Sequence, residues 1–153
     1  MSTPTPPIES LTLRKKLPCS PEQAFRAWTD PEQFQQWFVA MPGMTVKAQM
    51  DVRLGGKYRI SCARAGEPTK FVGGEFLVVD PPRRLEYTWI WEKEAMPEWK
   101  DRSVVKLAFN AIEGGKTELV LTHDHISNPE DRADHREGWT KILDSMAEAL
   151  ARK

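Results

Sequence analysis

The C-terminal segment carries one continuous apolar stripe, and this stripe constrains the fold more than any other feature of the sequence. Six residues recur at i, i+3, i+4, i+7, i+8 and i+11, so they share one face of a helix: Trp139, Ile142, Leu143, Met146, Ala147 and Leu150. Asn128 can cap the start of this helix, and Pro129 suits its first position. The sequence therefore predicts a long amphipathic helix over 129–150.

Two short helices are predicted near the N-terminus, after a first strand at 11–17. The tetrapeptides S-P-E-Q (20–23) and D-P-E-Q (30–33) each combine an N-cap oxygen, a proline at the first helical position and a glutamine placed to complete a capping box. Apolar residues follow each tetrapeptide at helical spacing. The proline-rich residues 1–7 are predicted to form a flexible tail, which leaves one domain over 8–153.

The middle of the chain is predicted to form strands. Apolar and polar residues alternate from Val46 to Leu54, and Gly55-Gly56 is interpreted as a two-residue hairpin turn before a return strand at 57–62. Short turns separate the remaining predicted strands, at 71–79, 84–91, 104–111 and 117–122. Consecutive strands joined by short turns pair antiparallel, so the fold class is α+β with the helices gathered on one face of the sheet.

Charge and composition narrow the possible functions. Lys plus Arg and Asp plus Glu are balanced at 22 each in 153 residues, which leaves no basic footprint for nucleic acid or anionic lipid. No apolar run reaches membrane-spanning length, and the first residues lack a signal-peptide pattern. We therefore expect a cytoplasmic location with no nucleic-acid and no membrane partner. Cys19 and Cys62 form no C-x-x-C pair.

Aromatic residues are the most telling part of the composition. Six tryptophans and six phenylalanines suit a large core or an aromatic-walled cavity. Tyr87, Trp89 and Trp91 share one face of the predicted strand R-R-L-E-Y-T-W-I-W, where the rings either pack under the terminal helix or contact a ligand. Met96 and Trp99 follow on a polar loop, where they either tuck into its base or form a lid over a cavity.

All three histidines fall within one stretch, L-T-H-D-H-I-S-N-P-E-D-R-A-D-H-R-E-G-W. His123 and His125 continue the covered face of the last strand, while His135 lies one turn before Trp139, so His123 and His135 are expected to converge. A metal site would need a third ligand, and no serine or cysteine stands in a nucleophile signature. We therefore predict no metal and no cofactor, and interpret these histidines as hydrogen-bonded residues at the rim of a pocket.

Five segments together resemble a known family. In chain order they are S-P-E-Q-A-F-R-A-W-T-D-P-E-Q-F-Q-Q-W-F, D-V-R-L-G-G-K-Y-R-I, D-P-P-R-R-L-E-Y-T-W-I-W, L-V-L-T-H and H-R-E-G-W. They are similar to the bacterial homologues of the C-terminal domain of the heat-shock protein 90 ATPase activator, within the START-like, birch-allergen-like (SRPBCC) superfamily. The resemblance covers about residues 11–150.

This resemblance implies a helix-grip fold: a curved antiparallel sheet of six or seven strands around the long terminal helix, with a hydrophobic cavity between them. It also implies a container whose use varies, since some relatives bind lipids, hormones or polyketides and a few are enzymes. Thr122-His123 and the segment from His135 to Trp139 match recurrent motifs of the family, whereas His125 matches none. Gly138 costs the helix ~1 kcal/mol relative to alanine, which is tolerable if it admits a strand or a ligand.

Three functions remain open. The first is a binding module for a small hydrophobic or aromatic ligand, with eight candidate lining residues: Trp37, Phe38, Tyr87, Trp89, Trp91, His123, His135 and Trp139. The second is a chaperone- or stress-related interaction module, although the co-chaperones of this family have two domains where this chain has one. The third is a cavity enzyme with His123 or His135 as general base, which is the less favoured reading. Monomer and homodimer are both compatible with the sequence.

Overall fold

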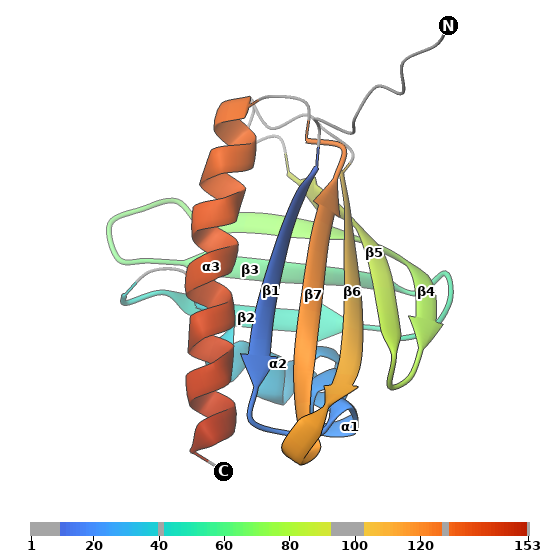
Figure 1. Ribbon diagram of the computed structural model, residues 1–153. Helices are drawn as coiled ribbons and strands as arrows, with labels where there is room; N and C mark the ends of the chain where they lie inside the picture. Colours follow the sequence, from blue (N-terminus) through green and yellow to red (C-terminus); the bar gives the residue numbers. More distant parts are fainter. Residues whose placement is uncertain (1–9, 40–41, 93–102, 127–128, 153) are drawn as a thin grey trace, which may run out of the picture.

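The computed structural model describes residues 10–39, 42–92, 103–126 and 129–152, and its architecture is a curled sheet gripping a long helix (Figure 1). The elements in chain order are β1 (Leu11–Leu17), α1 (Pro21–Thr29), α2 (Pro31–Trp37), β2 (Thr45–Met50), β3 (Lys57–Ala63), β4 (Lys70–Asp80), β5 (Arg84–Trp91), β6 (Ser103–Ile112), a 3₁₀ turn (Glu113–Gly115), β7 (Lys116–Asp124) and α3 (Pro129–Ala151). The predicted tail at 1–7 and the cap Asn128 lie outside the described residues.

The strands form one antiparallel seven-stranded sheet in the order β1-β7-β6-β5-β4-β3-β2. The sheet curls into a half-barrel, and α3 runs along its open side, with β1 beside it and β2 and β3 crossing behind (Figure 1). This is the helix-grip α+β fold predicted from the sequence. None of the described helices combines the length and the apolar character needed to cross a membrane.

The helix starts are built as the sequence indicates. The Ser20 hydroxyl accepts a hydrogen bond from the Gln23 backbone N–H at 3.2 Å, and the Gln23 side chain accepts one from the Ser20 N–H at 3.1 Å, which completes a capping box. At α2 the Asp30 carboxylate accepts from the Glu32 N–H at 3.0 Å. These caps fix the two short helices that close the lower end of the half-barrel.

The edge strand β2 is covered by α2. The side-chain oxygen of Gln35 accepts a hydrogen bond from the Ala48 backbone N–H at 2.8 Å, so a helix side chain occupies a backbone donor of the edge strand. At the other edge, the ammonium group of Lys15 on β1 pairs with the carboxylate of Asp144 on α3 at 2.6 Å. Both edges of the sheet are therefore tied to helices.

The predicted hairpin at Gly55-Gly56 is wrong in its position. Strand β2 ends at Met50, and the tight turn runs from Arg53 to Gly56, closed by a hydrogen bond from the Gly56 N–H to the Arg53 carbonyl at 2.8 Å. The backbone oxygen of Asp51 lies 1.9 Å from where a Cβ of Gly56 would stand, so close backbone approach requires glycine there. The alternating pattern to Leu54 overstated the strand, and the Leu54 side chain is 74% exposed.

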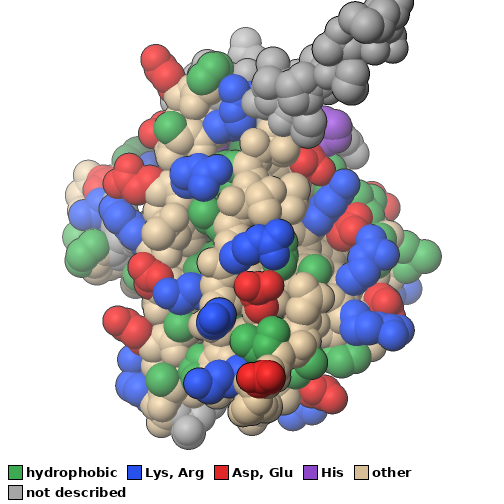
Figure 2. Space-filling view, in the orientation of Figure 1, with side chains coloured by type: hydrophobic (Ala, Val, Ile, Leu, Met, Phe, Trp, Pro, Cys, Tyr) green, Lys and Arg blue, Asp and Glu red, His purple; other side chains and the backbone are tan. Residues whose placement is uncertain are grey.

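The apolar stripe of α3 is buried in the concave face of the sheet, as predicted. Its buried members are Trp139, Ile142, Leu143, Met146 and Leu150. On the outer surface, positive and negative side chains are interspersed over α3, β1 and β7 (Figure 2). Such a mixed surface offers no single-sign footprint for a polyanion.

Because α3 packs into the concave face of the sheet, truncating a buried leucine of α3 should destabilise the protein far more than truncating an exposed leucine. Truncation of Leu143, which is 2% exposed, to alanine should lower the free energy of unfolding by about 2–5 kcal/mol because it leaves a cavity between helix and sheet. Leu54→Ala is the matched control, and it should change stability by less than about 0.5 kcal/mol. Urea denaturation measures both, and equal midpoints for the two variants would contradict the burial of the α3 stripe.

Candidate functional site

The centre of the half-barrel is filled by packed aromatic rings. Trp28 contacts Trp37 and Trp139, with ring centroids 4.8 and 6.2 Å apart. The indole N–H of Trp37 donates to the Ala27 carbonyl at 3.0 Å, and the indole N–H of Trp28 donates to the Tyr87 hydroxyl at 3.1 Å. Of the predicted lining residues, Trp37 and Tyr87 therefore lie in this packed core.

A cleft of about 360 Å³ lies next to this core, between the N-terminal half of α3 and the β3–β4 side of the sheet. It is partly open to solvent. Five predicted lining residues stand on its walls: Phe38, Trp89, Trp91, His135 and Trp139. The structure thus brings aromatic rings from the end of α2, from β5 and from α3 to one concave surface.

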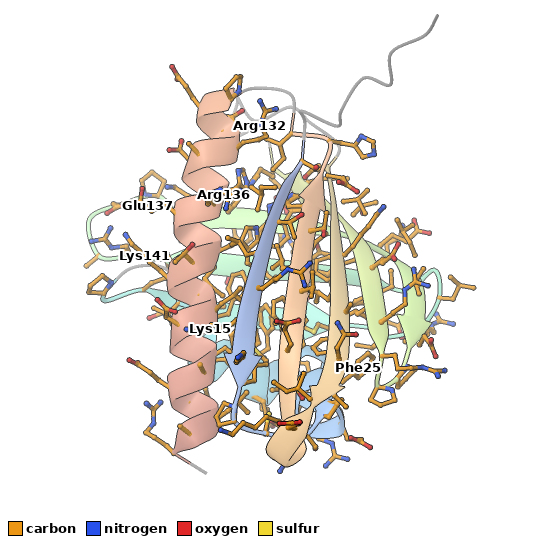
Figure 3. All side chains as sticks on the ribbon, in the orientation of Figure 1. Lys15, Phe25, Arg132, Arg136, Glu137 and Lys141 are labelled. Atoms are coloured by element: carbon orange, nitrogen blue, oxygen red, sulfur yellow. The ribbon has the colours of Figure 1, made fainter. Side chains whose placement is uncertain are left out.

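Several wall residues had not been predicted. They are Met44, Cys62, Arg64, Glu67, Pro68, Lys70, Asp134, Glu137, Gly138, Lys141 and Ile142. Most belong to the turn between β3 and β4, which carries no periodic signal, or to the side of α3 next to the apolar stripe, where Figure 3 labels Glu137 and Lys141. Of these residues, Gly138 had been singled out in the sequence as a glycine that could admit a strand or a ligand.

The charged side chains at the rim are balanced. Arg64 pairs with Glu67 at 3.1 Å within the β3–β4 turn, and Lys141 pairs with Glu137 at 3.2 Å along α3. Lys70 and Asp134 make no ion pair within the described part of the chain. The rim therefore carries three positive and three negative groups and selects weakly for ligand charge.

Cys62 places a thiol on the cleft wall. Burial raises the pKa of this thiol to about 11, although the nearby Lys70 charge opposes the shift. The group is therefore a protonated, weakly reactive thiol near neutral pH, unlike the thiolate of a nucleophilic cysteine. The same shift indicates that the surroundings of Cys62 disfavour negative charge.

His123 lies behind the cleft wall, in a chain of hydrogen bonds that runs from Trp139 to the backbone carbonyl of Trp89. Its Nδ1 accepts from the Trp139 indole N–H at 3.0 Å, and its Nε2 lies 2.8 Å from the Ser103 hydroxyl oxygen, which in turn donates to the Trp89 carbonyl at 2.7 Å. Because an indole N–H only donates, Nδ1 must be unprotonated and the proton sits on Nε2. Burial, with a smaller contribution from His135, holds the pKa of His123 well below its usual value.

His135 lines the cleft and converges on His123 as predicted, with ring centroids 5.0 Å apart. Its Nε2 accepts from the Trp91 indole N–H at 3.1 Å, and its Nδ1 lies 2.7 Å from the Asp131 carbonyl oxygen, to which it donates. Both ring nitrogens of both histidines therefore already have hydrogen-bond partners. We therefore interpret these hydrogen bonds as contacts that hold α3 on the sheet, rather than as part of a proton-transfer site.

His125 does not point to the covered face, and that prediction is wrong. Strand β7 ends at Asp124, and the next residue takes a left-handed conformation with φ of 66° that turns the exposed His125 side chain away from the sheet. Within the described residues, no group of three or more His, Cys, Asp or Glu side chains is arranged to hold a metal ion. Met96 and Trp99, for which the sequence left open a tuck into the loop base or a lid, lie outside the described residues.

Comparison with known proteins places this architecture in a family. The family described as "Activator of Hsp90 ATPase homolog 1-like protein" matches residues 18–151. The chain belongs to this family. Membership supports a ligand-binding type of module in general terms and leaves the ligand open. No curated protein matches the chain significantly.

Solved structures share the fold at low sequence identity. A protein from Chromobacterium violaceum is 22% identical, with a TM-score of 0.83 over 93% of this chain and 96% of its own. An AHSA1-like protein from Aeromonas hydrophila is 22% identical, with a TM-score of 0.73 over 93% of both chains. CalU16 from Micromonospora echinospora is 26% identical, with a TM-score of 0.68 over 92% of this chain and 75% of its own.

The buried neutral state of His123 predicts acid-sensitive stability. The unfolded chain binds a proton at this side chain near pH ~6.5, whereas the folded protein does not until a lower pH. Its contribution is therefore fully present above that pH, and the free energy of unfolding should fall on acidification by at most about 1.4 kcal/mol per pH unit. Urea denaturation from about pH 7 to about pH 5 measures the slope, above the range where most carboxylates titrate.

Two variants test whether this pH dependence of the unfolding free energy comes from His123. His123→Asn should be less stable at neutral pH, because it loses the Ser103 contact, and should show a shallower pH dependence. His125→Asn is the control, since asparagine tolerates the left-handed backbone at that position, and it should keep the wild-type slope. An unchanged slope in His123→Asn would show that this histidine does not stay neutral in the fold.

Proposed function

We propose that this protein binds a small, mostly apolar aromatic molecule in the cleft between α3 and the β3–β4 side of the sheet. The observation that carries the proposal is Gly138, a glycine inside a long helix that borders the cleft. A glycine in a helix interior costs ~1 kcal/mol relative to alanine, so its presence calls for a local reason.

Close packing does not supply that reason. A Cβ built on Gly138 has no atom of the described chain within 4 Å, beyond its own helical turn and its neighbours. The backbone there is helical and needs no special torsion angle. The glycine therefore enlarges an open space rather than admitting a strand, and that space is the cleft.

The chemistry of the walls favours an aromatic occupant. Phe38, Trp89, Trp91 and Trp139 offer ring faces and edges, while Met44 and Ile142 add adaptable and aliphatic surface. A volume of about 360 Å³ falls at the lower end of the range for pockets that bind small organic molecules. Rings held by the packed core behind them also give the cleft a preformed shape, which lowers the entropic cost of binding.

The other two functions have weaker support. An enzyme with His123 or His135 as general base would need a free ring nitrogen facing a substrate, and the hydrogen bonds of both rings are taken up within the protein. A chaperone- or stress-related interaction role rests on the family resemblance alone. The cytoplasmic location likewise remains an expectation from the sequence.

A side chain added at Gly138 tests the cleft directly. Gly138→Leu should weaken binding of the neutral dye Nile red by about tenfold or more, because the leucine fills the volume that the dye would occupy. The variant should fold at least as stably as the wild type, since leucine favours the helix. Dye fluorescence titrations measure binding, and thermal unfolding checks the fold.

Thr140→Leu is the matched control, because it adds a leucine to the exposed face of the same helix, away from the cleft. It should leave dye binding unchanged. Gly138→Ala should raise the free energy of unfolding by about 0.5–1 kcal/mol, since nothing obstructs the added methyl group. Equal dye affinity in Gly138→Leu and the wild type, or no dye binding by the wild type, would overturn the proposed function.

A further inference from the structure

We propose that the ligand is an uncharged planar aromatic molecule carrying a carbonyl-type oxygen, and that the indole N–H of Trp89 is the specificity-determining donor that binds this oxygen. The inference rests on the proposed function, since it specifies what occupies the same cleft.

Trp89 stands apart from the other tryptophans that the structure describes. Its side chain is 3% exposed and lines the cleft, yet its Nε1 has no hydrogen-bond partner in the described part of the chain. The other described indole N–H groups all donate within the protein: Trp28 to Tyr87, Trp37 to Ala27, Trp91 to His135 and Trp139 to His123. Of the indole donors that the structure describes, only that of Trp89 is therefore left unsatisfied by the fold.

An unsatisfied buried donor is expensive, and native proteins contain few of them. The ring of Trp89 lies in the midst of the residues that form the cleft, with centroids 5.1 Å from Trp139, 5.7 Å from Trp91 and 6.2 Å from Phe38. A molecule bound among these rings would contact the Trp89 ring. The Nε1 atom itself is shielded from solvent, so an acceptor reaches it when the bound molecule displaces part of the ring packing around it. If that molecule supplied an acceptor, it would satisfy the one indole donor that the described part of the chain leaves open.

The surroundings favour a neutral acceptor over a carboxylate. The rim is balanced in sign, and its Arg64 and Lys141 are already paired with acidic neighbours. The Cys62 thiol on the same wall is held in its neutral form by burial. A carboxylate bound at the Trp89 indole would lose hydration and gain one neutral donor there, which does not compensate for the desolvation of a charge. The desolvation cost of a ketone, amide or quinone oxygen is much smaller. Lys70, the rim cation without an ion pair in the described part of the chain, is matched in charge by Asp134, which likewise has none, so the rim adds no net positive charge.

Three naphthalenes of similar shape separate these contributions. 2-Acetylnaphthalene carries the acceptor, 2-isopropenylnaphthalene replaces its oxygen by a methylene group, and 2-naphthoate replaces the ketone by an anion. Isothermal titration calorimetry at neutral pH should show that the ketone binds about tenfold or more tightly than either analogue. In protein labelled with nitrogen-15 at the indole positions, the ketone should shift the Trp89 Nε1–H resonance downfield, and the hydrocarbon should not.

Two substitutions on β5 serve as a matched pair. Trp89→Phe keeps an aromatic ring but removes the donor, and it should abolish the preference for the ketone over the hydrocarbon. Trp91→Phe removes a donor that already has a partner in His135, and it should keep that preference. The indole resonances of the wild type give the same answer if Trp89→Phe does not fold.

The outcomes distinguish the two proposals. Equal affinity of the wild type for ketone and hydrocarbon, or an unshifted Trp89 resonance on ketone binding, would overturn the role of Trp89 while leaving the cleft as a binding site. Tighter binding of 2-naphthoate than of the ketone would overturn the uncharged class. If none of the three compounds binds the wild type, the proposed function itself fails.

Discussion

The hydrogen bond from Trp139 to His123 is the contact on which the helix-grip depends. Trp139 is the buried residue where the apolar stripe of α3 meets the packed core, and its ring contacts Trp28, Phe38 and Trp89. Its indole N–H also fixes the protonation state of His123, whose other nitrogen reaches Ser103 on β6. One side chain therefore holds the helix on the sheet through both apolar packing and a directed polar contact.

This arrangement also determines where an open space can remain. The rings of α1, α2 and β5 fill the middle of the half-barrel, where the described side chains pack closely against one another. Toward the start of α3 the rings give way to Gly138 and to the half-buried Trp91 and His135, whose hydrogen bond joins β5 to the helix. The cleft lies where the aromatic packing ends, with one wall of core rings and one wall of helix.

Much of this fold follows from local patterns in the sequence. Apolar spacing predicted the α3 stripe, proline with a capping residue predicted both short helices, and alternation with turn residues predicted the strands along the chain. The misplaced turn near Gly56 had a different origin, because the need for glycine there comes from the Asp51 carbonyl and not from the hairpin itself. His125 was assigned to the wrong face because the alternating pattern of the sequence extends one residue beyond Asp124, where strand β7 ends.

The site was less predictable than the fold. Which aromatic rings face a cleft and which face one another depends on packing between distant elements, so Trp37 and Tyr87 could not be separated from Trp89 by sequence alone. The unpartnered N–H of Trp89 is likewise visible only once the acceptors of all its neighbours are known. The useful sequence signal was a residue that local propensity disfavours, Gly138, since such a conflict is expected at functional positions.

The contact between Gln35 and the edge of β2 has a consequence for self-association. Edge strands with free backbone donors are templates for pairing with another chain, and they promote aggregation and domain swapping. Here an amide side chain mimics the missing neighbour strand at Ala48, and α2 covers the same edge. A second copy of the sheet could continue this one at β2 only after displacing that helix, so the contact opposes backbone pairing with another chain at this edge.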